Sequence, residues 1–110
     1  MAEPTLVQVF GANATQTATE LIISKTDLAT VGLTASANNT AESLVVGILQ
    51  LAKVELNTTK QETNTDIQVT ISDDATPTII NRNNSNYRQL TLTINLETPD
   101  TVTGIDPDDY

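Results

Sequence analysis

The chain has 110 residues, of which 38% are hydrophobic, and this size fits a single domain with a small core. It has twenty threonines and ten asparagines but no histidine, cysteine or tryptophan, which removes imidazole bases, thiol nucleophiles and any disulfide framework. Fourteen acidic against five basic residues give a net charge of −9, which disfavours direct contact with nucleic acid or anionic lipid. We therefore expect no enzymatic activity and no cofactor, and we expect packing or assembly to supply the stability.

Residues 1–37 alternate short apolar runs with stretches rich in Thr, Asn and Ala. The runs at 6–10 and 21–23 have the composition of short strands. Residues 11–19 show no hydrophobic period, so they form either an ordinary surface loop or an extended arm that adds a strand to a neighbour's sheet. The candidate partner contacts in this part are Leu6, Val7, Val9 and Phe10.

A helix is predicted within residues 38–60, from about Ala41 to Lys60. Asn39 and Thr40 are both good N-caps, and Glu42 follows Asn39 at the spacing of a capping box. The apolar run that comes next then lies inside the helix.

More than half of this helix surface would be apolar, beside a narrow polar stripe. A surface helix of a monomer normally shows a narrower apolar stripe, so this one is expected between two layers or against another subunit. Gly47 in its interior allows another backbone to come close, although a pair of strands broken at Gly47 is a competing interpretation. The stripe consists of Gln50, Lys53, Asn57 and Lys60, and the candidate contact residues are Leu44, Ile48 and Leu51.

Residues 66–97 alternate apolar and polar side chains, as strands do that have one face on a core and one face exposed. The alternation runs over 67–72 and again over 90–97, with a short strand expected at 78–80. Turn residues fill 73–77 and 81–86. The predicted fold is α+β: one central helix packed on a small antiparallel β-meander, with an extended N-terminal arm and an acidic C-terminal tail, in a single domain over residues 1–97.

The tail, residues 98–110, is either a solvated terminus or a docking peptide anchored by Ile105 and Tyr110. Asp106 and Asp108 have a spacing that calcium sites use, but the proline between them and the lack of an EF-hand loop favour an acidic turn. The adjacent carboxylates of Asp73 and Asp74 lack the aromatic platforms of a glycosidase cleft. No metal or catalytic site is therefore predicted.

Nothing at the start of the chain has the pattern of a signal peptide, and no apolar stretch reaches the roughly 18 residues of a membrane span. These features predict a soluble product made in the cytoplasm. Four glycosylation sequons are set aside, because a chain so rich in Thr and Asn contains them by chance. They begin at Asn13, Asn38, Asn57 and Asn83.

A small, acidic, cysteine-free chain rich in Thr, Asn and Ala, with a helix on a β-meander and extended termini, resembles the accessory virion proteins of tailed bacteriophages. These are capsid decoration (cement) proteins and small neck or tail components, and the resemblance is one of composition and layout. It implies a non-enzymatic virion protein that forms homo-oligomers. Such a protein stabilises an assembly through arm and tail contacts with itself and with a capsid, neck or tail protein, with decoration of a capsid as the first expectation.

Two other functions stay open. A small acidic cytoplasmic binding or regulatory module would occupy a basic site on a partner protein, and as a nucleic-acid mimic it would place its carboxylates in regular rows. An adhesin-like module on a surface or fibre would use the Thr-rich strand face.

Overall fold

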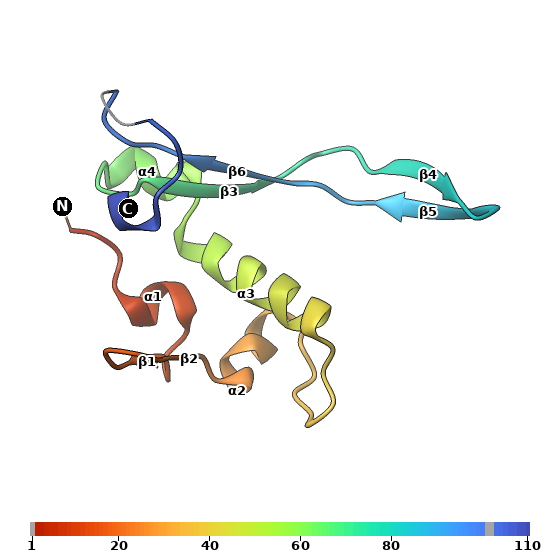
Figure 1. Cartoon of the computed structure of the whole chain (residues 1–110), viewed down its shortest axis with the longest axis horizontal. Coiled ribbons are helices and arrows are strands. Elements are labelled where there is room, and N and C mark those ends of the chain that lie inside the picture. The colour runs from red at the N-terminus through yellow and green to blue at the C-terminus, as the bar shows by residue number, and fades with distance from the viewer. Residues whose placement is uncertain (1, 101–102) are drawn as a thin grey trace.

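Helices and antiparallel strands share the chain in the computed structural model, which describes residues 2–100 and 103–110 (Figure 1). The predicted α+β class, with one long helix and antiparallel strands, is confirmed. The helices are α1 (Leu6–Phe10), α2 (Lys25–Leu28), α3 (Ala41–Glu55) and α4 (Thr58–Thr63), with 3₁₀ turns η1 (Ala29–Val31) and η2 (Pro107–Asp109). The strands are β1 (Thr15–Gln16), β2 (Leu21–Ile22), β3 (Val69–Asp73), β4 (Thr78–Arg82), β5 (Ser85–Gln89) and β6 (Leu92–Leu96).

The run at 6–10 is the helix α1, so its prediction as a strand is wrong. A capping box decides the conformation: the Gln8 backbone N–H donates to Thr5 Oγ1 at 3.2 Å, and the Thr5 N–H donates to Gln8 Oε1 at 2.8 Å. The strand predicted at 21–23 is present over Leu21–Ile22, where β2 pairs with β1 in a short surface hairpin. Residues 11–19, expected as a loop or an arm, therefore form a turn and one side of that hairpin.

The helix α3 begins where it was predicted, at Ala41. Thr40 is its N-cap, since its side chain accepts from the Ser43 N–H at 3.1 Å. Asn39 does not cap the helix. It stabilises the preceding loop instead, since its side-chain amide donates to the Thr34 carbonyl at 2.9 Å. The competing interpretation of this segment as two strands is wrong.

The predicted single helix to Lys60 is in fact two helices, because α3 ends at Glu55 and α4 begins at Thr58. Asn57 stabilises both ends of the break. Its Nδ2 donates to the carbonyls of Lys53 and Val54 at 2.9 and 3.1 Å, and its Oδ1 accepts from the Lys60 N–H at 2.9 Å. One side chain thus satisfies terminal groups of two helices and fixes the bend between them.

The strands β3 to β6 form one long two-stranded ribbon (Figure 1). β3 pairs with β6 and β4 pairs with β5, and between these pairs the Asp74 N–H donates to the Thr91 carbonyl at 2.9 Å. The turn predicted over 81–86 is shorter, because only Asn83 and Asn84 make it, with φ of 52° and 63°. Two consecutive positive φ values are those of a type I′ turn, whose twist matches that of the strands it joins.

The core lies where α1, the C-terminal half of α3 and the base of the ribbon meet. Val9, Ala52 and Ile71 are buried there. The half-buried side chains packed around them are Phe10, Leu49, Leu56 and Leu92. α4 packs on β3, and Thr70 on the polar face of β3 is only 2% exposed. The Thr-rich face was expected to be exposed to solvent, but part of it is covered.

Two glycines should respond oppositely to alanine. A Cβ at Gly47 would lie 3.6 Å from Leu28 Cδ1, an ordinary contact, so Gly47→Ala should raise the free energy of unfolding by about 0.5–1 kcal/mol through helix propensity. Gly11 has φ of 105°, and a Cβ there would lie 2.6 Å from Asp27 Cβ, so Gly11→Ala should lower the free energy by about 1–3 kcal/mol. Urea denaturation measures both, and equal effects would contradict this packing.

Removing the side chain of Asn57 should destabilise both helices that it caps. We expect Asn57→Ala to lower the free energy of unfolding by about 1–2 kcal/mol. Asn57→Asp keeps the acceptor for the Lys60 N–H but loses the donor to Lys53 and Val54, so it separates the two roles. Loss of helical circular dichroism on heating measures them, and two unchanged melting curves would show that the bend is held elsewhere.

Candidate assembly interface

The subunit exposes much more surface than a compact chain of its mass. Its accessible surface is 7974 Å², whereas a folded monomer of 11.8 kDa exposes about 5,900 Å². Its radius of gyration is 16.2 Å, against about 13 Å for a compact domain of this length. The difference in area, about 2,000 Å², exceeds the roughly 800 Å² that one partner buries in a standard interface.

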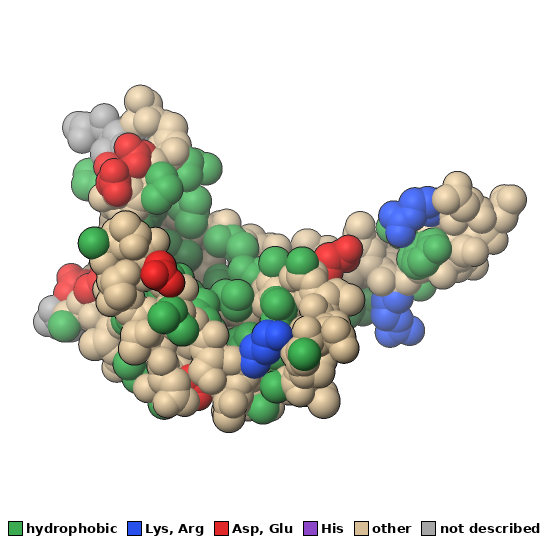
Figure 2. Space-filling view, turned by 60° about the horizontal axis from the view of Figure 1, so that its bottom comes forward, with side chains coloured by type: hydrophobic (Ala, Val, Ile, Leu, Met, Phe, Trp, Pro, Cys, Tyr) green, Lys and Arg blue, Asp and Glu red, His purple; other side chains and the backbone are tan. Residues whose placement is uncertain are grey.

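The ribbon accounts for part of this surface, because its outer half projects away from the body (Figures 1 and 2). We call this half, β4 and β5 with their turn, the hairpin arm (residues 78–89). Every residue of β5 is exposed, and in β4 only Ile80 is half-buried. An isolated two-stranded hairpin is marginally stable in water, so the arm has free energy to gain from a partner.

The hairpin arm differs from the body in charge. It contains Arg82 and Arg88, and no acidic residue lies between Asp74 and Glu97. The arm thus carries +2, while the rest of the chain, with three basic and fourteen acidic residues, carries −11. The Arg82 guanidinium lies 4.6 Å from the centre of the Tyr87 ring, so the arm presents a cation stacked on an aromatic surface.

The N-terminal half of α3 leaves apolar side chains uncovered. Val45 and Val46 are both more than half exposed, because α1 and the strands pack only against the later turns of the helix. A groove of about 430 Å³ lies between this half of α3 and the base of the hairpin arm. It is lined by Val46, Gln50, Asp73, Asp74, Leu90, Thr91 and Leu92.

The predicted contact residues of the N-terminal run mostly serve the chain's own fold. Val9 is buried in the core, and Phe10 packs against it. Leu6 is half-buried, and it lines a hollow together with Val9, Phe10 and Tyr110. Val7 is exposed and is the member of this run that a neighbour can reach.

The predicted contact residues of the helix are neither fully buried nor fully exposed. Leu44, Ile48 and Leu51 are each half-buried in the subunit. Gly47 is buried against Leu28 of α2, so part of the wide apolar surface is covered by α2 within the same chain. The surface that remains open on α3 is that of Val45, Val46 and Val54.

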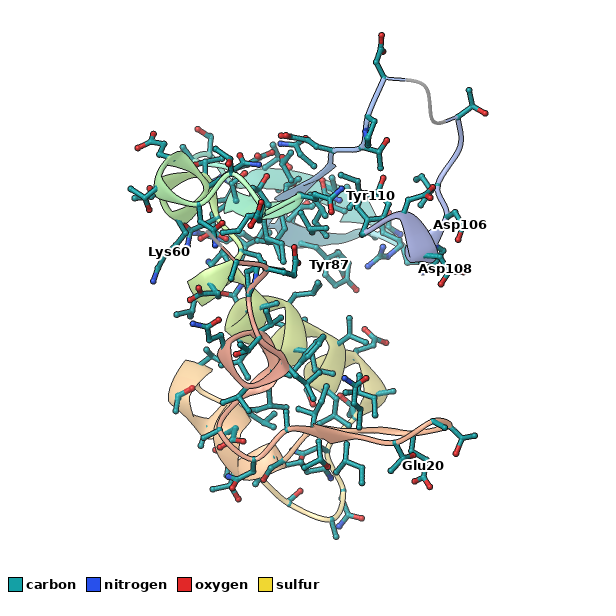
Figure 3. All side chains as sticks on the ribbon, turned by 90° about the vertical axis from the view of Figure 1, so that its left-hand side faces the viewer. Glu20, Lys60, Tyr87, Asp106, Asp108 and Tyr110 are labelled. Carbon is teal, nitrogen blue, oxygen red and sulfur yellow. The ribbon has the colours of Figure 1, made fainter. Side chains whose placement is uncertain are left out.

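The C-terminal segment 103–110 folds back on the ribbon. Gln68 Nε2 donates to the Asp109 carbonyl at 3.3 Å, and Tyr110 is half-buried in the hollow beside Phe10. Ile105 is 77% exposed. Of the two predicted anchors, Tyr110 therefore packs within the chain and Ile105 is open to solvent. Asp106 caps η2 by accepting from the Asp108 N–H, and both carboxylates lie at the periphery of the molecule (Figure 3).

The cationic hairpin arm and the groove at its base are features that sequence reasoning missed. One signal was present in the sequence: the interval from Ala75 to Leu96 contains two arginines and no acid in a chain with a charge of −9. The groove had no such signal, because it depends on the angle between α3 and the ribbon.

Other kinds of site find no support in the described residues. No group of three or more Asp or Glu side chains in residues 2–100 and 103–110 could hold a metal ion. No helix in that part of the chain is long and apolar enough to cross a bilayer. Comparison with protein-family models, with curated protein sequences and with solved structures found no match to this chain.

Proposed function

We propose that the chain is a non-enzymatic structural subunit that forms a symmetric homo-oligomer and works by occupying a place in a larger particle. A phage-like virion is the setting that its composition and layout favour, with capsid decoration first and a neck or tail position second. The observation that carries the proposal is the projecting hairpin arm, which is exposed on both strands and opposite in charge to the body.

The distribution of apolar side chains supports self-assembly. Among the described residues six hydrophobic ones are buried, and twelve large apolar ones are exposed. Most of these exposed side chains lie on the arm, on α3, on the small β1–β2 hairpin and on β6, and the others are Val7, Leu90 and Ile105. Apolar surface spread over several sides suits a subunit with more than one neighbour, as closed symmetric assemblies provide.

The work of such a subunit is thermodynamic. A protein that binds the assembled state and not the free components adds its interface free energy to the assembled state. Copies that are linked to one another bind multivalently, so many weak contacts together give a high overall affinity. The lack of histidine and cysteine does not impair this role, because it needs shape and area alone.

The mass of the purified protein in solution tests the proposal. We expect size exclusion with light scattering, over a concentration series, to give a defined multiple of 11.8 kDa, and electron microscopy to show closed particles of uniform size. A well-folded monomer at every concentration would contradict the proposal. That result would favour an acidic module that binds a basic partner.

A further inference from the structure

Resting on this proposed self-assembly, we propose that the hairpin arm of one copy binds the groove between α3 and the base of the arm in a second copy of this chain. The arm supplies two arginines and exposed apolar side chains. In the described part of the chain, the groove supplies apolar walls with one uncompensated carboxylate, Asp74, at its edge, and Glu42 lies on the neighbouring turn of α3. Each subunit thus carries both halves of the contact.

The groove is apolar within and acidic at its edge. Leu90 is 75% exposed on one wall, and Val46 is 56% exposed on the other. Lys53 Nζ lies 2.6 Å from the Asp73 carboxylate and compensates its charge. Asp74 accepts from the Thr93 hydroxyl at 2.9 Å, and within the described residues no basic side chain pairs with it.

Glu42 adds a second free carboxylate on the α3 side. It lies one turn before Val46, and the two residues together line the two hollows that adjoin this part of the helix. No ion pair of Glu42 occurs in the described part of the chain. Among the described residues, Glu42 and Asp74 are therefore two unpaired negative charges that the arginine on either face of the arm can approach.

The hairpin arm has complementary chemistry. Residues directly opposite in the strand pair share a face, so Ile80, Tyr87 and Arg82 lie on one face of the arm, and Ile79 and Arg88 lie on the other. Ile79 is 63% exposed and Tyr87 is also open to solvent. Each face therefore offers one arginine beside apolar side chains, which suits a groove with apolar walls and acidic edges.

The arm cannot fill the groove of its own chain. The groove lies at the base of the arm, where Leu90 directly follows β5, and the ribbon points away from it (Figure 2). Asn83 at the tip follows Asp74 by nine positions in the chain, which is up to about 30 Å if the chain is extended. The occupant must come from another copy, either by mutual exchange in a dimer or from each subunit to the next in a ring.

A charge swap tests the contact. One variant reverses the arm (Arg82→Glu with Arg88→Glu) and a second reverses the groove (Glu42→Lys with Asp74→Lys). Each variant alone should run as a monomer of 11.8 kDa in light scattering, and an equimolar mixture should associate again. Circular dichroism checks that each variant is folded. If the groove variant is unfolded, it is replaced by Glu42→Lys with Gln50→Lys, which leaves the ribbon unchanged.

A matched control changes the same number of charges at the opposite end of the ribbon. Glu62→Lys with Asp66→Lys, in and after α4, should keep the mass of the wild type. The inference is overturned if the arm variant keeps the wild-type mass, if the two folded monomers do not associate on mixing, or if the control also dissociates. A wild-type chain that is itself monomeric would instead contradict the proposed function.

Discussion

The central aliphatic core of the subunit is small, and its size limits how much of the chain it can cover. Val9 of α1, Ala52 of α3 and Ile71 of β3 are buried where three elements meet, with half-buried neighbours around them. The chain has only three aromatic residues, and Phe10 is the one packed against this core, so the core has few large side chains with which to extend along α3 or along the ribbon. The N-terminal half of the helix and the outer half of the ribbon therefore extend beyond it largely uncovered, and the groove lies between α3 and the base of the arm.

Secondary structure was predicted correctly where the hydrophobic periodicity and the helix-capping residues indicate the same element. It was predicted wrongly where these two signals disagree. The run at 6–10 contains two valines and a phenylalanine, which favour a strand, but the reciprocal hydrogen bonds of Thr5 and Gln8 start a helix that packs Val9 on α3. The break at Asn57 was hidden because asparagine suits a polar stripe as well as a cap. β5 was hidden because four of its five residues are polar, so it shows no apolar alternation.

Only part of the proposed interface could be predicted from the sequence. A helix with too much apolar surface correctly indicated that something must cover it, and α2 covers part of that surface within the same chain by packing Leu28 on Gly47. The uncovered part, Val45 and Val46, depends on where α1 and the ribbon stop, which is a tertiary property. The charge of the hairpin arm was visible in the sequence, but its meaning depends on the arm's projection from the body.

Charge would also decide how such subunits meet. Bodies with a charge of −11 repel one another, which opposes random contact between their exposed apolar side chains. An acidic body attracts an arm with a charge of +2, so the approach of arm to body is favoured over body to body or arm to arm. In the proposed assembly, the charge imbalance that weakens a compact monomer would also favour one docking orientation, so the sparse core and the high net charge would serve the same assembly.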